Sequence, residues 1–539
     1  MFGFKKHVSH SGAFGDGRFC SFFSPGPGGV VTLAFWLLLS ACAPSPDEVE
    51  DRADGLEAPP PAETEDQDKD PEALVREGKR VIRMIPGEYM PGRRPQGVGE
   101  RLRELEKLVD EYERLNPDVR VVMQQVGGAD LTEGEYIATQ IMGGIAPDIV
   151  QINAEVVWQD VDKGWWVPFD TYLNEPNAYA EDGGPGSEAW MDVFANKLLT
   201  RAKQAPDGRL YTLTYDIVET AIYYNRDIFR RLDLSPPTTW AEFIEIQRKV
   251  KDAGMIPIGM TVDHAVDWSQ DFFFDQFFYP IIDRLDLREM APELADYYQG
   301  YLFTDELCWG ILNETISAEE PRYREMWRVM REWRDYWPRD IVRSNLDRMF
   351  LLQRTPMVWS TSGFVRRLMY DPLVDFEWGV FYLPPITKET SPQASGVDPA
   401  VIGGSGMQYS VTRTAKQRDE QDPGHLEQVI DFLQFMTLPK NAVPVVNEAS
   451  LFVPNFAGAE LAPELEPFLE IIDKRYTTTK WRDTLDRRWL DRNRRLIELF
   501  LGDALSLDEF MTLMDENNRD TARRIADREG WTFEEPHWQ

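Results

Sequence analysis

The alternation of strand and helix signals between residues 79 and 150 constrains the fold more than any other feature of the chain. A β-branched run at 81–85 precedes a helix pattern at 102–115, a strand at 119–123, a helix at 131–143 and a strand at 148–150. The breakers Asn116-Pro117 and Ala146-Pro147 separate these elements. Links this short predict a parallel sheet with right-handed crossovers, and therefore an α/β fold.

Polar and aromatic side chains follow the predicted strands directly. In a sheet of this kind, ligands lie beyond the carboxyl ends of the strands. The residues at those positions are Glu88 after the first strand, and Asn153, Glu155 and Trp158 after the third. We expect these four side chains to contribute to a ligand site.

The N-terminal region carries the pattern of an export signal. Basic residues precede an apolar run at 30–39, which leads into Ser40-Ala41-Cys42. The run is too short to span a bilayer, and small residues before a cysteine resemble the bacterial lipoprotein signal. We expect residues 1–41 to be removed, Cys42 to carry acyl chains and the protein to be anchored at the extracytoplasmic face of the cell membrane. The alternative is a buried helix that ends in an ordinary cysteine, and the Gly/Pro-containing stretch before residue 30 leaves a later start codon open.

The formal net charge of −34 at pH 7 argues against a nucleic-acid partner, because such binding depends on clustered Lys and Arg. Residues 47–70 hold eleven Asp or Glu against two basic residues. This segment cannot bury enough apolar surface to offset its ordering entropy, so 42–78 is expected to be a disordered acidic tether. Residues 66–70 imitate a calcium loop, but Pro71 stands where the sharp turn needs a glycine. We predict no metal site and no cofactor.

Several short motifs follow one another along the rest of the chain. They are Gly164-Trp165-Trp166-Val167-Pro168-Phe169, the stretch 207–216, Tyr224-Asn225-Arg226-Asp227, Pro237-Thr238-Thr239-Trp240, the stretch 354–363, Gly403-Gly404-Ser405-Gly406 and the helix pattern 429–436. In this order and spacing they resemble the extracellular solute-binding proteins that include the maltose-binding protein. The resemblance covers most of residues 79–455.

The resemblance implies two α/β lobes joined by hinge strands, with the ligand cleft between them. On this basis we assign 79–213 to the first part of lobe 1, 214–355 to the first part of lobe 2, 356–415 to the second part of lobe 1, and 416–539 to the second part of lobe 2. The segment 281–345 is longer than a minimal second lobe requires, and its tryptophans either widen the cleft or form a packed face. The tail 460–539 shows helix patterns and is expected to pack on lobe 2.

Aromatic residues suit a sugar ligand, because a pyranose stacks its apolar face on a ring. The chain has 17 Trp, although most aromatics in a chain of this size belong to the core. Trp158, Trp268 and Phe364 follow predicted strand or motif ends, and we predict that they stack on the ligand. A plain core position is the alternative for each of them.

Polar ligand contacts are expected at three further places. The resemblance points to the segment after the first lobe crossing, which here holds Tyr215, Asp216 and Glu219. The loop with Ser362 and Gly363, and the loop with Gly404 and Ser405, offer backbone N–H groups at close range. Ordinary cap and turn chemistry is the alternative for these residues.

The resemblance implies a binding protein, not an enzyme, that captures a small solute for the permease subunits of an ABC importer. A sugar or oligosaccharide is the preferred ligand, and a polyamine is the alternative that the acidic composition also fits. A surface-anchored glycoside hydrolase with paired carboxylates, and a ligand sensor that acts on a membrane receptor, are the rival functions. We expect a monomer with a small-molecule ligand and no nucleic acid.

Overall fold

The computed structural model describes residues 71–125, 133–197, 199, 202–205, 207–287, 300–475 and 479–532, which all belong to the compact unit Ala62–Gln539. The predicted signal at 1–41, the predicted lipidation site Cys42 and the tether up to residue 70 lie outside the described residues. The end of the predicted tether is not disordered, because Pro71–Arg76 forms helix α2 and buries Leu74. A proline in the first helical turn costs no hydrogen bond, so the helix starts where the acidic run ends.

The first sheet contains the three strands predicted between residues 79 and 150 and two further strands from later parts of the chain. Its strand order is β2-β1-β3-β9-β4, and β1, β2 and β3 are parallel, as predicted. Strand β9 returns antiparallel between β3 and β4. The bounds are β1 Arg80–Ile85, β2 Val119–Met123, β3 Ile149–Gln151, β4 Leu213–Thr214 and β9 Gln408–Val411.

Helices from two distant parts of the chain enclose this sheet. Apolar residues of α3, α18 and α19 share one core with the sheet, while α4 and α5 pack in a second, smaller cluster. Tyr112 on α3, for example, packs edge-on against Phe432 on α18 at 4.9 Å between ring centroids. The bounds are α3 Glu104–Leu115, α4 Glu133–Met142, α5 Ala154–Trp158, α6 Asp170–Leu173, α17 Arg413–Asp419, α18 His425–Met436 and α19 Pro439–Ala449.

The second sheet is organised around one long strand. Strand β5 pairs antiparallel with β8 and β10 through its first residues and with β6 and β7 through its last. Its ten residues are almost all buried, which fits its β-branched and aromatic composition. The bounds are β5 Asp216–Asn225, β6 Met357–Thr361, β7 Trp378–Phe381, β8 Gly403–Ser405 and β10 Val453–Pro454.

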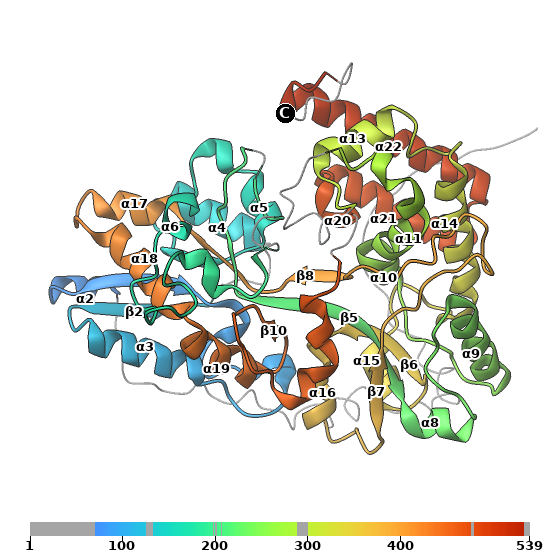
Figure 1. Ribbon diagram of the computed structural model, residues 1–539, viewed down its shortest axis with the longest axis horizontal. Coiled ribbons are helices and arrows are strands. Elements are labelled where there is room, and N and C mark those ends of the chain that lie inside the picture. The colour runs from blue at the N-terminus through green and yellow to red at the C-terminus, as the bar shows by residue number, and fades with distance from the viewer. Residues whose placement is uncertain are drawn as a thin grey trace, which may run out of the picture. The chain divides into compact units, whose positions relative to one another are not determined.

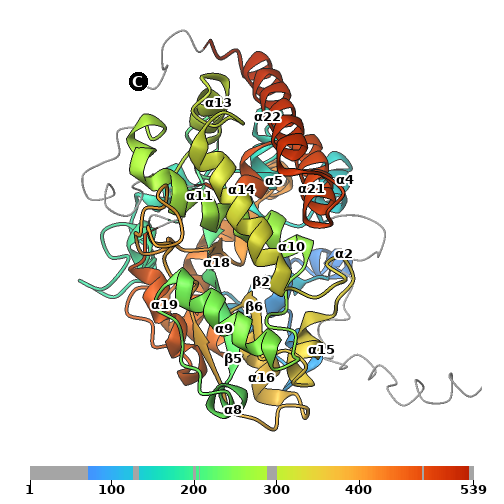
Figure 2. The same ribbon diagram turned by 90° about the vertical axis from the view of Figure 1, so that its right-hand side faces the viewer.

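Helices of the second lobe form a large aromatic core. Figure 2 shows α9, α11 and α14 in front of the second lobe, with α21 and α22 beside them. Trp327 and Trp333 on α14 are fully buried and Trp337 nearly so, so the packed-face alternative is correct for these three. The bounds are α8 Arg226–Arg231, α9 Trp240–Asp252, α10 Val262–His264, η5 Ala265–Ser269, α11 Gln270–Phe278, α13 Thr304–Leu312, α14 Pro321–Trp333, α15 Leu346–Leu351, α16 Phe364–Tyr370, η8 Pro463–Ile472, α20 Trp481–Thr484, α21 Arg487–Leu501 and α22 Leu507–Glu529.

The lobe boundaries predicted after residue 355 are wrong in two places. Strand β6 lies in the second sheet, paired with β5, although 356–415 was assigned to lobe 1. Helices α18 and α19 pack on the first sheet, although 416–539 was assigned to lobe 2. Both lobes are α/β, so the local pattern of a strand or helix does not say which of the two sheets it joins. The helical tail does belong to lobe 2, since Phe500 and Phe510 lie in the same core as Trp327.

Three segments of the described chain meet where the lobes join. Tyr215 is the single residue between β4 and β5, and Gly406-Met407 separate β8 from β9. The backbone N–H of Tyr215 donates to Met407 O at 2.9 Å, and that of Asn455 donates to Tyr215 O at 3.2 Å. Short crossings held together in this way suit a hinge.

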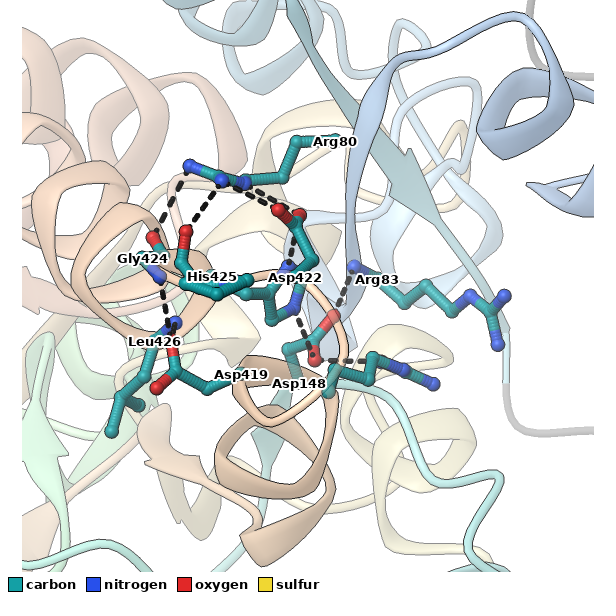
Figure 3. A network of polar contacts seen from close by, with 10 residues as sticks. Arg80, Arg83, Asp148, Asp419, Asp422, Gly424, His425 and Leu426 are labelled. Atoms are coloured by element: carbon teal, nitrogen blue, oxygen red, sulfur yellow. Dashed lines mark hydrogen bonds and ion pairs between the residues drawn. The ribbon is translucent and has the colours of Figure 1, made fainter.

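A partly buried polar network fixes the returning helices to the first sheet near the starts of β1 and β3 (Figure 3). Arg80, at the start of β1, donates to both oxygens of Asp422 at 2.7 Å. Asp148, directly before β3, accepts hydrogen bonds from Arg418 at 2.6 Å and from the backbone N–H of Arg83 at 2.8 Å, and lies 3.0 Å from the ring of His425. The network joins segments more than 250 residues apart, which is why α17 and α18 belong to lobe 1.

Within the described residues, no helix combines the length and the apolar character needed to cross a membrane.

Candidate functional site

The first wall of the candidate site lies on α5, immediately after strand β3. Asn153 precedes the helix, and Glu155 and Trp158 lie within it, as the strand-end rule predicts. A residue that the sequence did not indicate completes the wall. Lys203, only 3% exposed, forms an ion pair with Glu155, and its carbonyl accepts a hydrogen bond from the Trp158 ring N–H at 3.1 Å.

Charges from both lobes act on Glu155. Burial raises the pKa of this carboxyl, but the positive charge and hydrogen bond of Lys203, with a further contribution from Lys480, outweigh burial and hold the pKa below its ordinary value. Lys480 directly precedes α20 of the second lobe, and Figure 1 shows α5 and α20 on the same side of β8. Glu155 is therefore a carboxylate at neutral pH, with cations from both lobes near it.

The second wall is a small pocket beside β5. Glu219, predicted as a ligand residue, is 2% exposed and accepts a hydrogen bond from Lys474 at 3.3 Å. The Lys474 ammonium lies 3.0 Å from the ring centroid of Tyr382. Aromatic and apolar side chains close the rest of the pocket, which is lined by Glu219, Thr220, Phe272, Trp359, Tyr382, Leu383, Pro399, Ala400, Ile402 and Lys474.

Trp268 extends this aromatic wall. It is half-buried on the π-helical turn η5, and its ring lies 5.4 Å from that of Trp359 and 4.9 Å from that of His264. Burial lowers the pKa of His264 to about 4, so the ring is neutral at pH 7. Since His264 Nε2 lies 3.0 Å from the carbonyl of Trp359, Nε2 carries the proton, and this hydrogen bond fixes the ring next to Trp268.

Tyr215 and Asp216 belong to the hinge and do not face an open site. Both are buried, and the Asp216 carboxylate accepts hydrogen bonds from the Tyr89 hydroxyl and, at 2.9 Å, from the Met407 N–H. Burial raises the pKa of Asp216 to about 7, because these two hydrogen bonds only partly offset desolvation. The packing around it is so tight that a Cβ on Gly406 would lie 2.0 Å from its oxygen. This placement does not support the predicted ligand role of these two residues.

Ser362, Gly363 and Phe364 lie at the contact between α16 and lobe 1. Ser362 donates to Leu451 O at 2.9 Å, the Gly363 carbonyl accepts from Gln96 at 2.7 Å, and Phe364 is 2% exposed in an apolar core. In Figure 1, α16 and α19 lie below β5, whereas α5 and α20 lie above it. This position does not support the predicted ligand role, and for Phe364 the core alternative is correct.

The remaining predicted residues have local roles. Glu88 forms an ion pair with Arg93 at 3.1 Å. Gly404 lies within β8, paired with Val218 at a positive φ of 137°, and Ser405 shares a hydrogen bond with Thr214 at 3.0 Å beside the hinge. Gly404 and Ser405 therefore belong to a strand beside the crossing, and this position does not support their predicted ligand role.

The residues that the sequence analysis missed are Lys203, Lys474, Tyr382 and Trp359. Lys203, Lys474 and Tyr382 lie outside the motifs named above, and Trp359 lies within the stretch 354–363 but was not singled out. The one usable signal is charge, since lysine is scarce in so acidic a chain and a buried lysine needs a carboxylate partner. Within the described part of the chain, no group of three or more His, Cys, Asp or Glu side chains is arranged to hold a metal ion.

The amino-acid sequence is similar to those of known binding proteins. A sequence model of the family described as bacterial extracellular solute-binding protein matches residues 99–443, which is more than half of the chain. The multiple sugar-binding protein of Streptococcus mutans is 24% identical over 156 residues, which are 29% of this chain and 32% of that protein. An sn-glycerol-3-phosphate-binding periplasmic protein of Rhizobium meliloti is 39% identical over 59 residues, which are 10% of this chain and 14% of that protein. The matched segments thus span less than a third of this chain's length and at most about a third of theirs.

Solved structures support the two-lobe fold. The raffinose complex of the solute-binding protein RafE superposes with a TM-score of 0.54 at 15% sequence identity, over 82% of this chain and 99% of RafE. At this identity the match establishes the fold alone.

Proposed function

Because the chain belongs to the family of bacterial extracellular solute-binding proteins, we propose that it captures a sugar or oligosaccharide outside the cytoplasm and delivers it to an ABC permease. The observation that carries the proposal is the pair of matching walls. Each wall sets a lysine–glutamate ion pair beside an aromatic ring: Lys203, Glu155 and Trp158 on one wall, and Lys474, Glu219 and Tyr382 on the other.

This arrangement fits the chemistry of a saccharide. The rings offer apolar faces for stacking, and the carboxylates, held ionised by the ammonium groups beside them, accept hydrogen bonds from hydroxyl groups. Closure of the lobes would bring both walls onto one ligand, and the contacts made only in the closed form would supply the free energy of closure. Trp268 and Asn153 are the proposed additional ligand contacts.

The relatives are consistent with this ligand class. One relative is named for binding multiple sugars, and the RafE structure contains raffinose. The relative named for sn-glycerol 3-phosphate suggests a second candidate, an anionic solute, for which Lys203 and Lys474 would be the counter-charges. A polyamine would use the carboxylates instead.

We further propose that Cys42 carries the lipid anchor and that the protein acts as a monomer. Incorporation of a labelled fatty acid into the wild-type chain but not into Cys42→Ser tests the anchor. Equal labelling of both chains, or none, would count against it.

A thermal-shift panel of the purified full chain tests the ligand. It contains raffinose, chito- and xylo-oligosaccharides, sn-glycerol 3-phosphate and spermidine, since a ligand that binds only the folded state raises Tm by mass action. Stabilisation by a saccharide that is recovered intact supports the binding protein. Stabilisation followed by cleavage supports the glycoside hydrolase, and stabilisation by spermidine or the phosphate replaces the sugar with that class. Loss of solute uptake in a strain that lacks this protein supports an importer, and unchanged uptake supports a sensor.

A further inference from the structure

We propose that Lys203 is the positioning residue of the first wall. In this role it holds Glu155 ionised and fixes Glu155 and Trp158 in the arrangement that meets the ligand. The inference rests on the proposed function for its ligand contact, but its electrostatic part is a property of the ligand-free protein.

Burial is the first observation. The Lys203 side chain is 4% exposed and that of its partner Glu155 is 13% exposed. An ammonium group this deeply buried is costly unless it is paired, and breaking such a pair leaves an uncompensated charge. The pair therefore behaves as one unit, and neither partner has an alternative position in water.

Lys203 also contacts both other members of the wall. Its ammonium pairs with Glu155 and lies 5.9 Å from the centroid of the Trp158 ring, while its backbone carbonyl accepts the ring N–H of that tryptophan at 3.1 Å. Glu155 and Trp158 are three residues apart on one short helix, so they face the same side. One lysine thus sets the charge of the first and the ring orientation of the second.

The segment that carries Lys203 leads directly to the hinge. Ala205 N donates to Arg209 O at 2.9 Å and Gly208 N to Ala205 O at 2.8 Å, which closes a turn just before β4. Strand β4 ends one residue before β5. Lys203 is therefore connected by a short, hydrogen-bonded segment to the crossing between the lobes.

The second lobe supplies another cation. Lys480, which directly precedes α20, also favours the ionised form of Glu155. Lys203 and Lys480 are the titratable groups that act on this carboxylate from the elements near it. With Lys203 removed, burial would dominate and the carboxyl would titrate at a higher pH.

The test compares Lys203→Met, Lys203→Arg and a control, Lys163→Met. Lys163 pairs with Asp160 and lies 4.6 Å from the centroid of Trp165 in the same lobe, but its side chain is 48% exposed. The first readout is the titration of the Glu155 carboxyl by 13C NMR in ligand-free protein, assigned with Glu155→Gln. We expect the Glu155 pKa to rise in Lys203→Met and to stay near its wild-type position in Lys203→Arg and Lys163→Met.

The second readout is the affinity for raffinose by calorimetry at pH 5.5 and pH 7.5. Lys203→Met is expected to bind about tenfold more weakly at the lower pH than at the higher, because Glu155 becomes protonated, whereas the wild type changes little. An unchanged Glu155 titration in Lys203→Met, or an equal shift in Lys163→Met, would overturn the inference. Absence of raffinose binding in every variant, with the expected NMR shift, would fault the ligand assignment and leave the positioning role standing.

Discussion

Glu155 and Asp216 are two buried carboxylates with opposite protonation behaviour. Both were predicted as ligand residues, Glu155 from its place after a predicted strand and Asp216 from the family resemblance. Glu155 is paired with Lys203, and its pKa lies below the ordinary value, whereas the pKa of Asp216 is raised by burial to about 7. The difference follows from their neighbours. A cation that shares the buried space stabilises the charge, while a tyrosine hydroxyl and a backbone N–H only partly replace water.

The comparison separates Glu155, which we propose as a ligand residue, from Asp216, which lies at the crossing of the lobes. A carboxylate that remains ionised can accept ligand hydroxyl groups at neutral pH. Asp216 has its lone pairs committed to Tyr89 and Met407, at the crossing of the lobes. Its protonation therefore concerns the stability of the hinge and not ligand contact.

Asp216→Asn should have the largest effect of the variants considered, because it removes the titrating carboxyl of Asp216 from the comparison with Glu155. In the folded wild type, the Asp216 carboxyl keeps its proton up to about pH 7, while in the unfolded chain it loses the proton near 3.8. Between these values the folded state binds more protons, so this group lowers the free energy of unfolding as pH rises, by about 4 kcal/mol in total. Asparagine removes this dependence. Urea unfolding of both chains at pH 5 and pH 8 measures it, and equal pH dependence in the two chains would contradict the prediction.

A third buried carboxylate, Asp148, resembles Glu155 because neighbouring side chains lower its pKa. Burial raises its pKa, but His425 and Arg418 outweigh burial, so its pKa is lowered. The stabilisation that the ionised Asp148 carboxyl provides is therefore present above the pKa of this group in the unfolded chain. It is lost as the pH falls through the lower pKa of the group in the folded chain. Arg418→Met removes one partner of the buried carboxylate and should lower the free energy of unfolding at pH 7 by about 3 kcal/mol. A loss below about 0.5 kcal/mol, which is the usual range for surface pairs, would show that His425 alone suffices.

The two walls of the candidate site permit a smaller, functional test. Glu155→Gln and Glu219→Gln each keep the size of the side chain but remove its charge, so each should weaken raffinose binding about tenfold, or about 1.4 kcal/mol. Both variants should keep the wild-type fold by circular dichroism. If only one of them weakens binding, the ligand contacts a single wall.

Arg248→Met on α9 provides the smallest expected effect. Arg248 pairs with Glu245 at 2.7 Å and with Asp252 at 2.9 Å, but its side chain is 54% exposed. These ionic contacts should stabilise the folded state far less than the contact between Arg418 and Asp148 does, because water and salt screen exposed charges. If urea unfolding shows that Arg248→Met lowers the free energy of unfolding as much as Arg418→Met does, burial does not explain the difference between the Asp148 pair and a surface pair.

The sequence by itself determined the parallel strand–helix alternation, the helical tail and the place of Glu155 and Trp158 directly after β3, because each depends on local periodicity or on position at a strand end. Tertiary structure alone decided which sheet β6, α18 and α19 join, since both lobes offer the same local environment. It also brought Lys203 to Glu155 and Lys474 to Glu219, pairs that are 48 and 255 residues apart in the chain. Charge pairing in the interior acts through space and leaves no periodic pattern in the sequence. Only the tertiary structure therefore separated Glu155, which remains charged, from Asp216, which holds its proton.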